Sequence, residues 1–259
     1  MPFTQKLLLT VPTVPLGILI VVLAITFAFA GLLLVRRLVP KSILKPHHEL
    51  TNAIFGAIAM AYAVLLAFVV VVAWQNYDKT KTIVETEANC LVDLHRNSFA
   101  FPQMFQAQLQ NILKYYVNTV INEEWQKLAK GEESENARTA LRRVWSLYTS
   151  FEPKTEKEKI FLAESASKLD NLREARRLRI TDSRAGVPLV LWFILIVGAV
   201  TTVSFSLLFG ADSFVAHLLM ASSLSVIIAL TLYTILLFDF PFTGGVSIGP
   251  ETFLRIVSF

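Results

Sequence analysis

Five arginine residues lie in a short stretch before a long apolar run, at Arg173, Arg176, Arg177, Arg179 and Arg184. In a helix of about 3.6 residues per turn, several of these guanidinium groups share one face. Such a face attracts anions, either the phosphates of lipid headgroups or ions that gather at a pore mouth. The alternative is a solvated basic flank of a membrane span, partly neutralised by neighbouring carboxylates. We therefore treat these arginines as candidates for binding lipid or anions.

Two glutamates, Glu85 and Glu87, lie in a charged segment that follows another apolar run. If several chains surround an axis, such residues can form an acidic ring in a vestibule, which favours cations. Residues two apart lie on different faces of a helix, so both cannot point at one axis. The alternative is an ion pair with Lys81 or with a neighbouring helix.

The remaining polar residues match no catalytic pattern. The chain has four histidines and no pair at helical spacing with a catalytic glutamate between them. It also lacks a glycine-rich phosphate loop, a Gly-x-Ser-x-Gly turn and a Cys-x-x-Cys pair. Because Cys90 is the single cysteine, no disulfide can form within one chain. We predict no catalytic residue, no metal site and no cofactor, and expect that the protein is not an enzyme.

The composition indicates how these residues are positioned. Of the 259 residues 54% are hydrophobic and 17% charged, whereas globular domains carry about 25% charged residues. Residues 76–186 hold 18 of the 24 Lys and Arg and 16 of the 20 Asp and Glu. One hydrophilic block therefore lies between apolar ends. The net charge of +4 is too balanced to favour nucleic acid as a partner.

The apolar ends contain four runs long enough to cross a bilayer, about 16–35, 50–74, 187–209 and 214–238. The first run stops at Arg36 and Arg37. A signal peptide cleaved after Ala30 is the alternative for that run, but the apolar residues continue past the small-residue site to a charged stop. The sequence thus predicts a first transmembrane pair in 1–75 and a second in 187–238.

The second span continues directly into the charged block. Beyond Gly56 neither glycine nor proline interrupts this stretch, and apolar residues recur at a helical period, so we predict one helix from Leu50 to about Leu94. Small residues four apart on its first half permit close approach of another helix. The candidates for lining a pore or packing on a helix are Asn52, Ala59, Tyr62, Ala63 and Ala67.

Residues 76–186 are predicted to form a helical domain of four segments. A second helix opens at Pro102 and closes at Gly131, and a third runs from about Glu135 to Phe151. Thr155 and Glu158 have the spacing of a capping box, which starts a fourth helix that ends near Arg184.

The last segment, 239–259, is predicted to be a tail at the membrane interface, because its prolines and paired glycines forbid a long helix. Its motif residues are assigned a structural role: Asp239, Pro241, Phe242, Gly244, Pro250, Glu251 and Phe253.

Orientation follows from the Lys and Arg residues near the span ends. The connector between the first two spans supplies four such residues, and the opposite side supplies ten. We therefore expect both termini and the helical domain to lie in the cytoplasm.

Several segments resemble the bacterial bestrophin-like family, which is classed as a domain of unknown function. They are 35–40 with His48 and Glu49, 62–68, 85–89, 172–179, 239–244 and 250–253, and the likeness covers essentially the whole chain. The chain departs from the usual pattern at Phe240, where the family often has arginine, and at Asn52 and Ala53.

The resemblance implies an all-α integral membrane protein of the bacterial inner membrane, with four transmembrane helices in two hairpins and a helical cytosolic domain inserted between spans two and three. True bestrophins are oligomeric chloride channels whose second span lines a pore. The family name records a likeness to them rather than a demonstrated activity, and no bestrophin pore motif transfers residue by residue.

Two functions are therefore open. The first is a homo-oligomeric ion channel with span two around the axis and with anionic membrane lipids as partners. The alternative is a non-conducting scaffold that binds an unknown protein through its helical domain. The span cores contain no Asp, Glu, Lys or Arg, which argues against a proton-coupled transporter.

Overall fold

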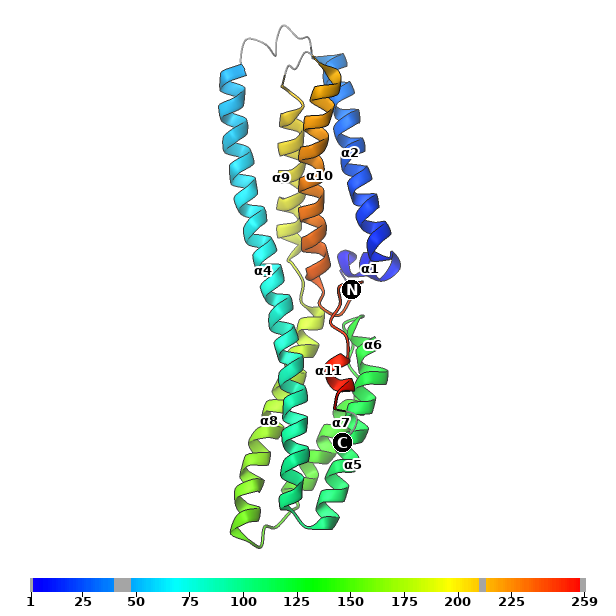
Figure 1. Ribbon diagram of the computed structural model, residues 1–259, viewed down its shortest axis with the longest axis vertical. Helices are drawn as coiled ribbons and strands as arrows, with labels where there is room; N and C mark the ends of the chain where they lie inside the picture. The colour runs from blue at the N-terminus through cyan, green and yellow to red at the C-terminus, as the bar shows by residue number, and fades with distance from the viewer. Residues whose placement is uncertain (1, 40–47, 210–212, 257–259) are drawn as a thin grey trace. The chain divides into compact units, whose positions relative to one another are not determined.

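The computed structural model describes residues 2–39, 48–209 and 213–256, which form helices and connecting loops with no strand (Figure 1). Parts of the predicted basic connector, including Pro40, Lys41 and His47, lie outside the described residues. Asp212, which lies between the last two predicted spans, is also outside the described residues. Phe259, at the end of the predicted tail, is also outside them.

The chain divides into two compact units. The span unit comprises Thr10–Gln75 and Val187–Asp239, and the helical unit comprises Met1–Leu9, Asn76–Gly186 and Phe240–Phe259. The 50-residue helix α4 (His48–Asn97) belongs to both, because its first half lies in the span unit and its second half in the helical unit. This confirms the prediction of one uninterrupted helix.

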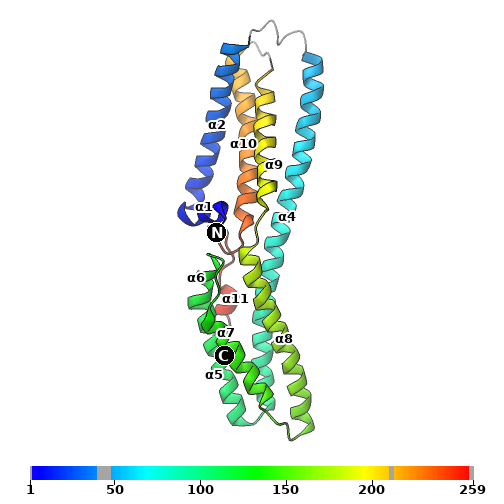
Figure 2. The same ribbon diagram turned by 180° about the vertical axis from the view of Figure 1, so that it is seen from behind.

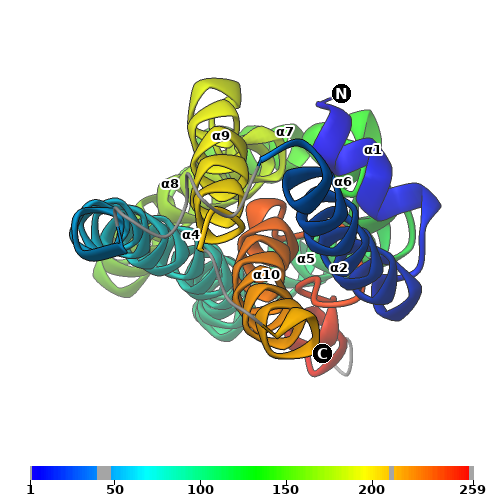
Figure 3. The same cartoon turned by 90° about the horizontal axis from the view of Figure 1, so that it is seen from above.

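The span unit is built from the first half of α4 together with α2 (Thr13–Leu38), α9 (Leu189–Ser206) and α10 (Phe214–Asp239). Each of these four helices is long and apolar enough to cross a membrane, as predicted. Helix α10 packs against both α2 and α9 (Figure 3). Their contact surfaces bury residues such as Ala28, Leu32, Leu195, Ala221 and Ile228.

Helix α4 meets α9 at a close approach between Tyr62 and Gly198. A side chain at position 198 would collide with the Tyr62 ring, so glycine is what permits this packing. The Tyr62 hydroxyl donates a hydrogen bond to the Leu195 carbonyl at 2.8 Å. A small residue on one helix and an amphipathic aromatic residue on the other therefore join the two spans.

The helical unit contains the second half of α4, the short 3-10 turn η2 (Ser98–Ala100), α5 (Gln103–Thr119), a π-helical turn η3 (Val120–Glu124), α6 (Trp125–Leu128), α7 (Glu135–Thr149) and α8 (Glu156–Arg184). Pro102 precedes α5, and Gly131, at φ +71°, follows α6. Ser134 caps α7, and Thr155 with Glu158 forms the capping box of α8. These ends confirm the predicted helices, whereas the π-helical turn was not foreseen.

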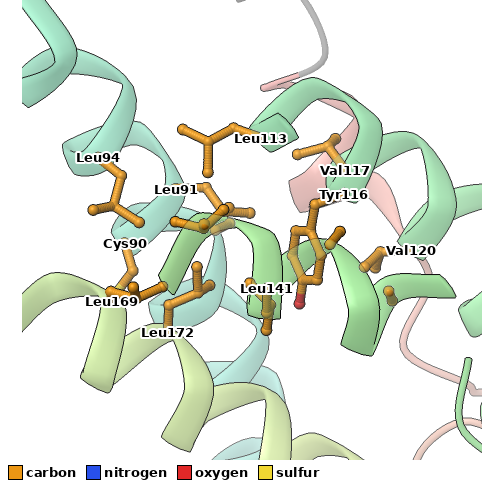
Figure 4. Packing of buried hydrophobic residues seen from close by; sticks show 14 of the residues in the cluster. Cys90, Leu91, Leu94, Leu113, Tyr116, Val117, Val120, Leu141, Leu169 and Leu172 are labelled. Atoms are coloured by element: carbon orange, nitrogen blue, oxygen red, sulfur yellow. The ribbon is translucent and has the colours of Figure 1, made fainter. Parts of the chain in front are cut away.

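The apolar faces of α4, α5, α7 and α8 form one core (Figure 4). Leu91 from α4, Leu113 from α5, Leu141 from α7 and Leu172 from α8 are buried in it. Burial of each such side chain contributes about 1.5–3 kcal/mol. Helical periodicity on four separate segments thus accounts for the assembly of this unit.

The C-terminal tail packs into the same core. Phe242, Ile248 and Phe253, the last in the short helix α11 (Glu251–Leu254), are buried there. The Trp125 ring contacts Phe242 and Phe253, and its indole N–H donates to the Ile248 carbonyl at 3.0 Å. The predicted place of the tail at a membrane interface stays a prediction, and the structure adds that its aromatic residues anchor it to the helical unit.

A short N-terminal helix, α1 (Phe3–Thr10), also contributes to the helical unit and was not foreseen. Gln5 donates to the Ala129 carbonyl at 3.2 Å, and Leu8 lies against Gly244. Gly244 has φ +87°, a conformation that side chains rarely adopt, so glycine is required at this turn.

Candidate functional site

The most distinctive polar feature of the helical unit is a cluster of four buried charges. Glu87 comes from α4, Glu124 from η3, and Arg176 and Arg179 from α8. Each occupies a position on the apolar face of its helix; Arg176 and Arg179, for example, continue the spacing of Leu169 and Leu172. We call these four residues the buried ion-pair network.

Arg179 lies at the centre of the network. Its Nε donates to one Glu87 carboxylate oxygen at 2.6 Å and its Nη2 to the other at 2.9 Å. The same Nη2 donates to Glu124 at 2.7 Å. Arg176 then forms two hydrogen bonds with Glu124, of 3.2 and 2.5 Å. Two carboxylates and two guanidinium groups therefore neutralise one another.

Neutral groups complete the network. The Tyr116 hydroxyl donates to Glu87 at 2.6 Å, and the Ser134 backbone N–H donates to Glu124 at 3.0 Å. Arg176 also donates to the Ser134 carbonyl at 3.1 Å. The Arg179 guanidinium lies 5.2 Å from the centroid of the Trp125 ring, a cation–π distance. Such pairing is needed because an isolated ion in an apolar interior is strongly unfavourable.

The environment shifts the pKa values of these groups. Burial raises the pKa of Tyr116 well above its ordinary value, and the Glu87 carboxylate adds to that effect. Burial alone would raise the pKa of Glu124, but Arg179, Arg176 and the Ser134 N–H outweigh it and leave that pKa below the ordinary value. Burial opposes the charge on Arg179, yet Glu87 and Glu124 raise its pKa. Glu124 and Arg179 therefore stay charged near neutral pH, and their pairing holds η3 against α8.

Helix α8 is tied to the second half of α4 along its length (Figure 2). Besides the Glu87–Arg179 pair, Thr80 donates to Asp182 at 2.9 Å, and Lys168 pairs with Asp93 at 2.7 Å. Residue numbers rise along α4 while those of the partners fall along α8, so the two helices are antiparallel. The Glu87–Arg179 pair is fully buried, whereas the Lys168–Asp93 pair is partly exposed.

The two glutamates predicted for a vestibule have different surroundings. Glu85 is exposed on α4, and Glu87 is buried against Arg179. This agrees with the argument that residues two apart cannot share a face. The contact that Glu87 makes is the ion pair with a neighbouring helix that sequence analysis left open.

The five arginines also divide into two groups. Arg176 and Arg179 are buried in the network, while Arg173, Arg177 and Arg184 are exposed. The structure therefore brings two of the predicted lipid or anion ligands to carboxylates within the protein. It leaves three on the surface.

The candidate residues on the first half of α4 lie on two faces. Tyr62 is buried against α9, whereas Asn52, Ala63 and Ala67 are exposed and Ala59 is partly exposed. The small face of α4 is therefore largely uncovered within one chain.

The tail motif has mainly structural contacts. The Asp239 carboxylate accepts hydrogen bonds from the Val187 backbone N–H and from the Trp192 indole at 3.4 Å, at the start of α9. The Pro241 carbonyl accepts from the Ile248 N–H at 2.7 Å. Pro250 precedes α11, and Glu251 is exposed in its first turn.

Among the described residues, no group of three or more His, Cys, Asp or Glu side chains is arranged to hold a metal ion. His217 in α10 is buried, and its Nε2 lies 3.0 Å from the Ser206 carbonyl of α9. This is the interhelical contact expected for a polar residue inside a span.

Sequence reasoning missed Glu124 as a member of the network, and it missed Tyr116 and Trp125 as the neutral residues that contact it. A signal was present, because Glu124 continues the apolar series of Leu113, Tyr116 and Val120 at helical spacing. A charge on the buried stripe of a helix requires a partner of opposite sign on a facing helix.

The fold matches solved structures of membrane proteins. A bestrophin homologue from Klebsiella pneumoniae that carries one substitution has a TM-score of 0.69 and 13% identity, covering 93% of this chain and 97% of its own. A second structure of that homologue has a TM-score of 0.68 and 13% identity, and the match covers 93% of this chain and 95% of that one. A structure described only as a membrane protein has a TM-score of 0.69 and 14% identity, and the match covers 93% of this chain and 95% of that one. No curated protein matches the sequence. At these identities the likeness defines a bestrophin fold.

The family follows from the sequence itself. The model of the bestrophin-like domain matches residues 22–253, which is most of the chain. The chain therefore belongs to the bestrophin-like family, as the resemblance indicated.

Proposed function

We propose that this protein is a homo-oligomeric ion channel of the membrane, in which the first half of α4 faces a central axis. The observation that carries the proposal is the uncovered small face of α4. Ala63 and Ala67 are exposed in the single chain, although Tyr62 and Leu66 beside them are buried. A helix face of small residues suits either a neighbouring helix or a narrow water-filled path.

The proposed topology has two transmembrane hairpins, 1–75 and 187–238. Residues 76–186 form a cytosolic helical domain between them, and 239–259 form a tail at the interface. The distribution of Lys and Arg supports cytoplasmic termini in a bacterial inner membrane. The fold of the bestrophin homologues supports the same plan, and the chain is proposed not to be an enzyme.

In this proposal the second half of α4 forms the wall of a vestibule. Glu85 is exposed there, as are Thr82, Thr86 and Asn89, and these residues offer polar groups to ions. Glu87 contributes indirectly, because its ion pair with Arg179 holds α4 against α8. The proposed partners are anionic membrane lipids and further copies of the chain.

The experiment is reconstitution of the purified protein in liposomes, with separate assays of chloride and potassium flux. The proposal expects flux above that of empty vesicles for at least one ion. Absence of flux for both ions would contradict it.

A matched pair of substitutions tests the role of α4. Ala63 and Ala61 are both exposed. Because they are two positions apart in the sequence, they lie about 200° apart around the helix. Ala63→Trp is expected to abolish flux by filling the axis, and Ala61→Trp is expected to leave it largely unchanged. Equal effects of the two substitutions would contradict the assignment of the pore face.

A scaffold that binds a protein partner is the second candidate. It is favoured by apolar side chains exposed on the helical unit, with Phe99 61%, Met104 75% and Ile160 64% exposed. The mass of the detergent-solubilised protein distinguishes the two functions. Four or five copies would favour the channel, and one or two would favour the scaffold.

A further inference from the structure

A groove opens on the surface of the helical unit between α7 and α8. It has a volume of about 950 Å³ and is lined by Leu141, Trp145, Ile180 and Thr181 together with charged residues. The groove lies beside the buried ion-pair network, because Arg176 lines it as well.

The groove is unusually rich in arginine. Its lining has three carboxylates, from Glu133, Asp170 and Glu174, and no lysine. The six arginines that line it are Arg138, Arg142, Arg173, Arg176, Arg177 and Arg184. A guanidinium presents a planar set of N–H donors that binds phosphate in a bidentate manner, which an ammonium does not.

Part of this basic lining is held in position. Arg176 is fixed by Glu124 and the Ser134 carbonyl, and Arg173 lies 5.3 Å from the centroid of the Trp145 ring. Arg184 donates its Nε to the Gly131 carbonyl at 2.8 Å, and within the described part of the chain it has no carboxylate partner. These contacts orient guanidinium groups without neutralising all of them.

The other arginines have partners that an anion can displace. Arg177 pairs with Glu174 one turn away, and both side chains are more than half exposed. Arg142 pairs with Glu135, and both of these side chains are also more than half exposed. Exposed ion pairs of this kind contribute about 0–1 kcal/mol, so a ligand with several negative charges competes with them at little cost.

We propose that this groove binds a phosphate-bearing anion through its arginines. The shared chemistry is a phosphate monoester or a chain of phosphates, and it can come from a lipid headgroup or from a soluble molecule. Arg184 precedes the first residue of the apolar helix α9 by five positions, which is compatible with a lipid source. The site stands apart from ion conduction, because none of its residues belongs to the proposed pore face.

The test uses the full chain in a neutral detergent and calorimetric titration with two probes. Inorganic tripolyphosphate represents a soluble source, and dioctanoyl phosphatidic acid represents a lipid source, with dioctanoyl phosphatidylcholine as the uncharged comparison. We expect saturable binding of at least one anionic probe. The probe that binds more tightly identifies the source.

Substitutions locate the binding. The double variant Arg142→Gln/Arg184→Gln should weaken binding at least about tenfold, since it removes two charge-assisted contacts. Arg143→Gln is the matched control, because Arg143 is exposed next to Arg142 but does not line the groove. Saturable binding that the double variant weakens and the control retains supports the proposal. Absence of saturable binding, or equal loss in the control, overturns it, and neither result depends on measured flux.

Discussion

Tyr62 in the span unit and Arg179 in the helical unit are both buried, but their polar groups have different kinds of partner. The Tyr62 hydroxyl donates to a backbone carbonyl of α9, and His217 likewise contacts a carbonyl. Arg179 is bound by two carboxylates from two other segments. Along α4, the buried polar side chain in the span unit thus binds a neutral backbone carbonyl of α9, and the one in the helical unit binds a guanidinium group of α8.

The difference follows from the surroundings that each unit is built for. Inside hydrocarbon an ionised side chain is strongly unfavourable, whereas a hydroxyl can share a carbonyl that is already bonded within its helix. Removing such a hydroxyl leaves no polar group without a hydrogen bond, because the carbonyl keeps the bond within its helix. Removing one member of a buried ion pair leaves a charge without compensation, so the helical unit should be the more sensitive of the two.

The largest effect is expected for Arg179→Met. Of its partners among the described residues, Glu87 would keep Tyr116 alone, and breaking a buried ion pair lowers the free energy of unfolding by about 3–5 kcal/mol. We expect the melting temperature of the purified protein, followed by circular dichroism, to fall by roughly 10 °C. Arg177→Met, two residues away and exposed, should change it little. Similar melting of the two variants would contradict the role of the network.

In the span unit the corresponding substitution is Gly198→Ala. The new methyl group would collide with the Tyr62 ring, and overpacking of this kind typically reduces stability by about 1–3 kcal/mol. Gly56→Ala is the control, since a side chain there meets no described atom within 4 Å, and alanine favours helix. In detergent, Gly198→Ala should unfold at a lower temperature than Gly56→Ala. A stable Gly198→Ala variant would show that α4 and α9 do not pack closely.

Acid should weaken the helical unit through Glu124. Its pKa is lower in the folded protein than in the unfolded chain, so its stabilising contribution is complete above about pH 4.3 and is lost as the pH falls through the folded pKa. Glu123, whose hydrogen bonds with Lys127, Asn136 and Ser134 lower its pKa to about 2, acts in the same direction.

Glu124→Gln should therefore be less stable than the native protein at pH 7 and lose less stability between pH 4.5 and 3. The measurement is the melting temperature across this range. If the melting temperature of Glu124→Gln fell with pH as steeply as that of the native protein, Glu124 would not contribute to the acid sensitivity.

The smallest effect is expected for Tyr62→Phe. This change removes the hydrogen bond to the Leu195 carbonyl and keeps the ring against Gly198. Hydrogen bonds between membrane helices average about 0.6 kcal/mol, so melting should shift by only a few degrees. A loss as large as that of Arg179→Met would remove the contrast between the units.

The helices were largely predictable, because their signals are local. Apolar runs marked the four spans, Thr155 with Glu158 marked the start of α8, and an uninterrupted stretch marked the length of α4. The π-helical turn at 120–124 has no such local signal, since its residues also fit an ordinary helix.

The buried ion-pair network was less predictable because its partners are far apart in sequence. Glu87 and Arg179 are separated by 92 positions, and only the packing of α4 on α8 brings them together. The position of Arg179 on an apolar face was visible in the sequence, but it did not identify which acid it meets. The tail was similar, since Phe253 could contact lipid or protein until the core of the helical unit was known.

The central proposal is that Ala63 on α4 faces a water-filled axis. Cys90 is the single cysteine and is buried, so an added cysteine can be labelled against a low background. Ala63→Cys and Ala61→Cys proteins in liposomes would be treated with a charged, water-soluble maleimide while flux is recorded. The proposal predicts that the cysteine at position 63 reacts and flux stops, and that the one at position 61, facing lipid, does not react. An unreactive position 63, or equal reaction at both positions, would contradict it.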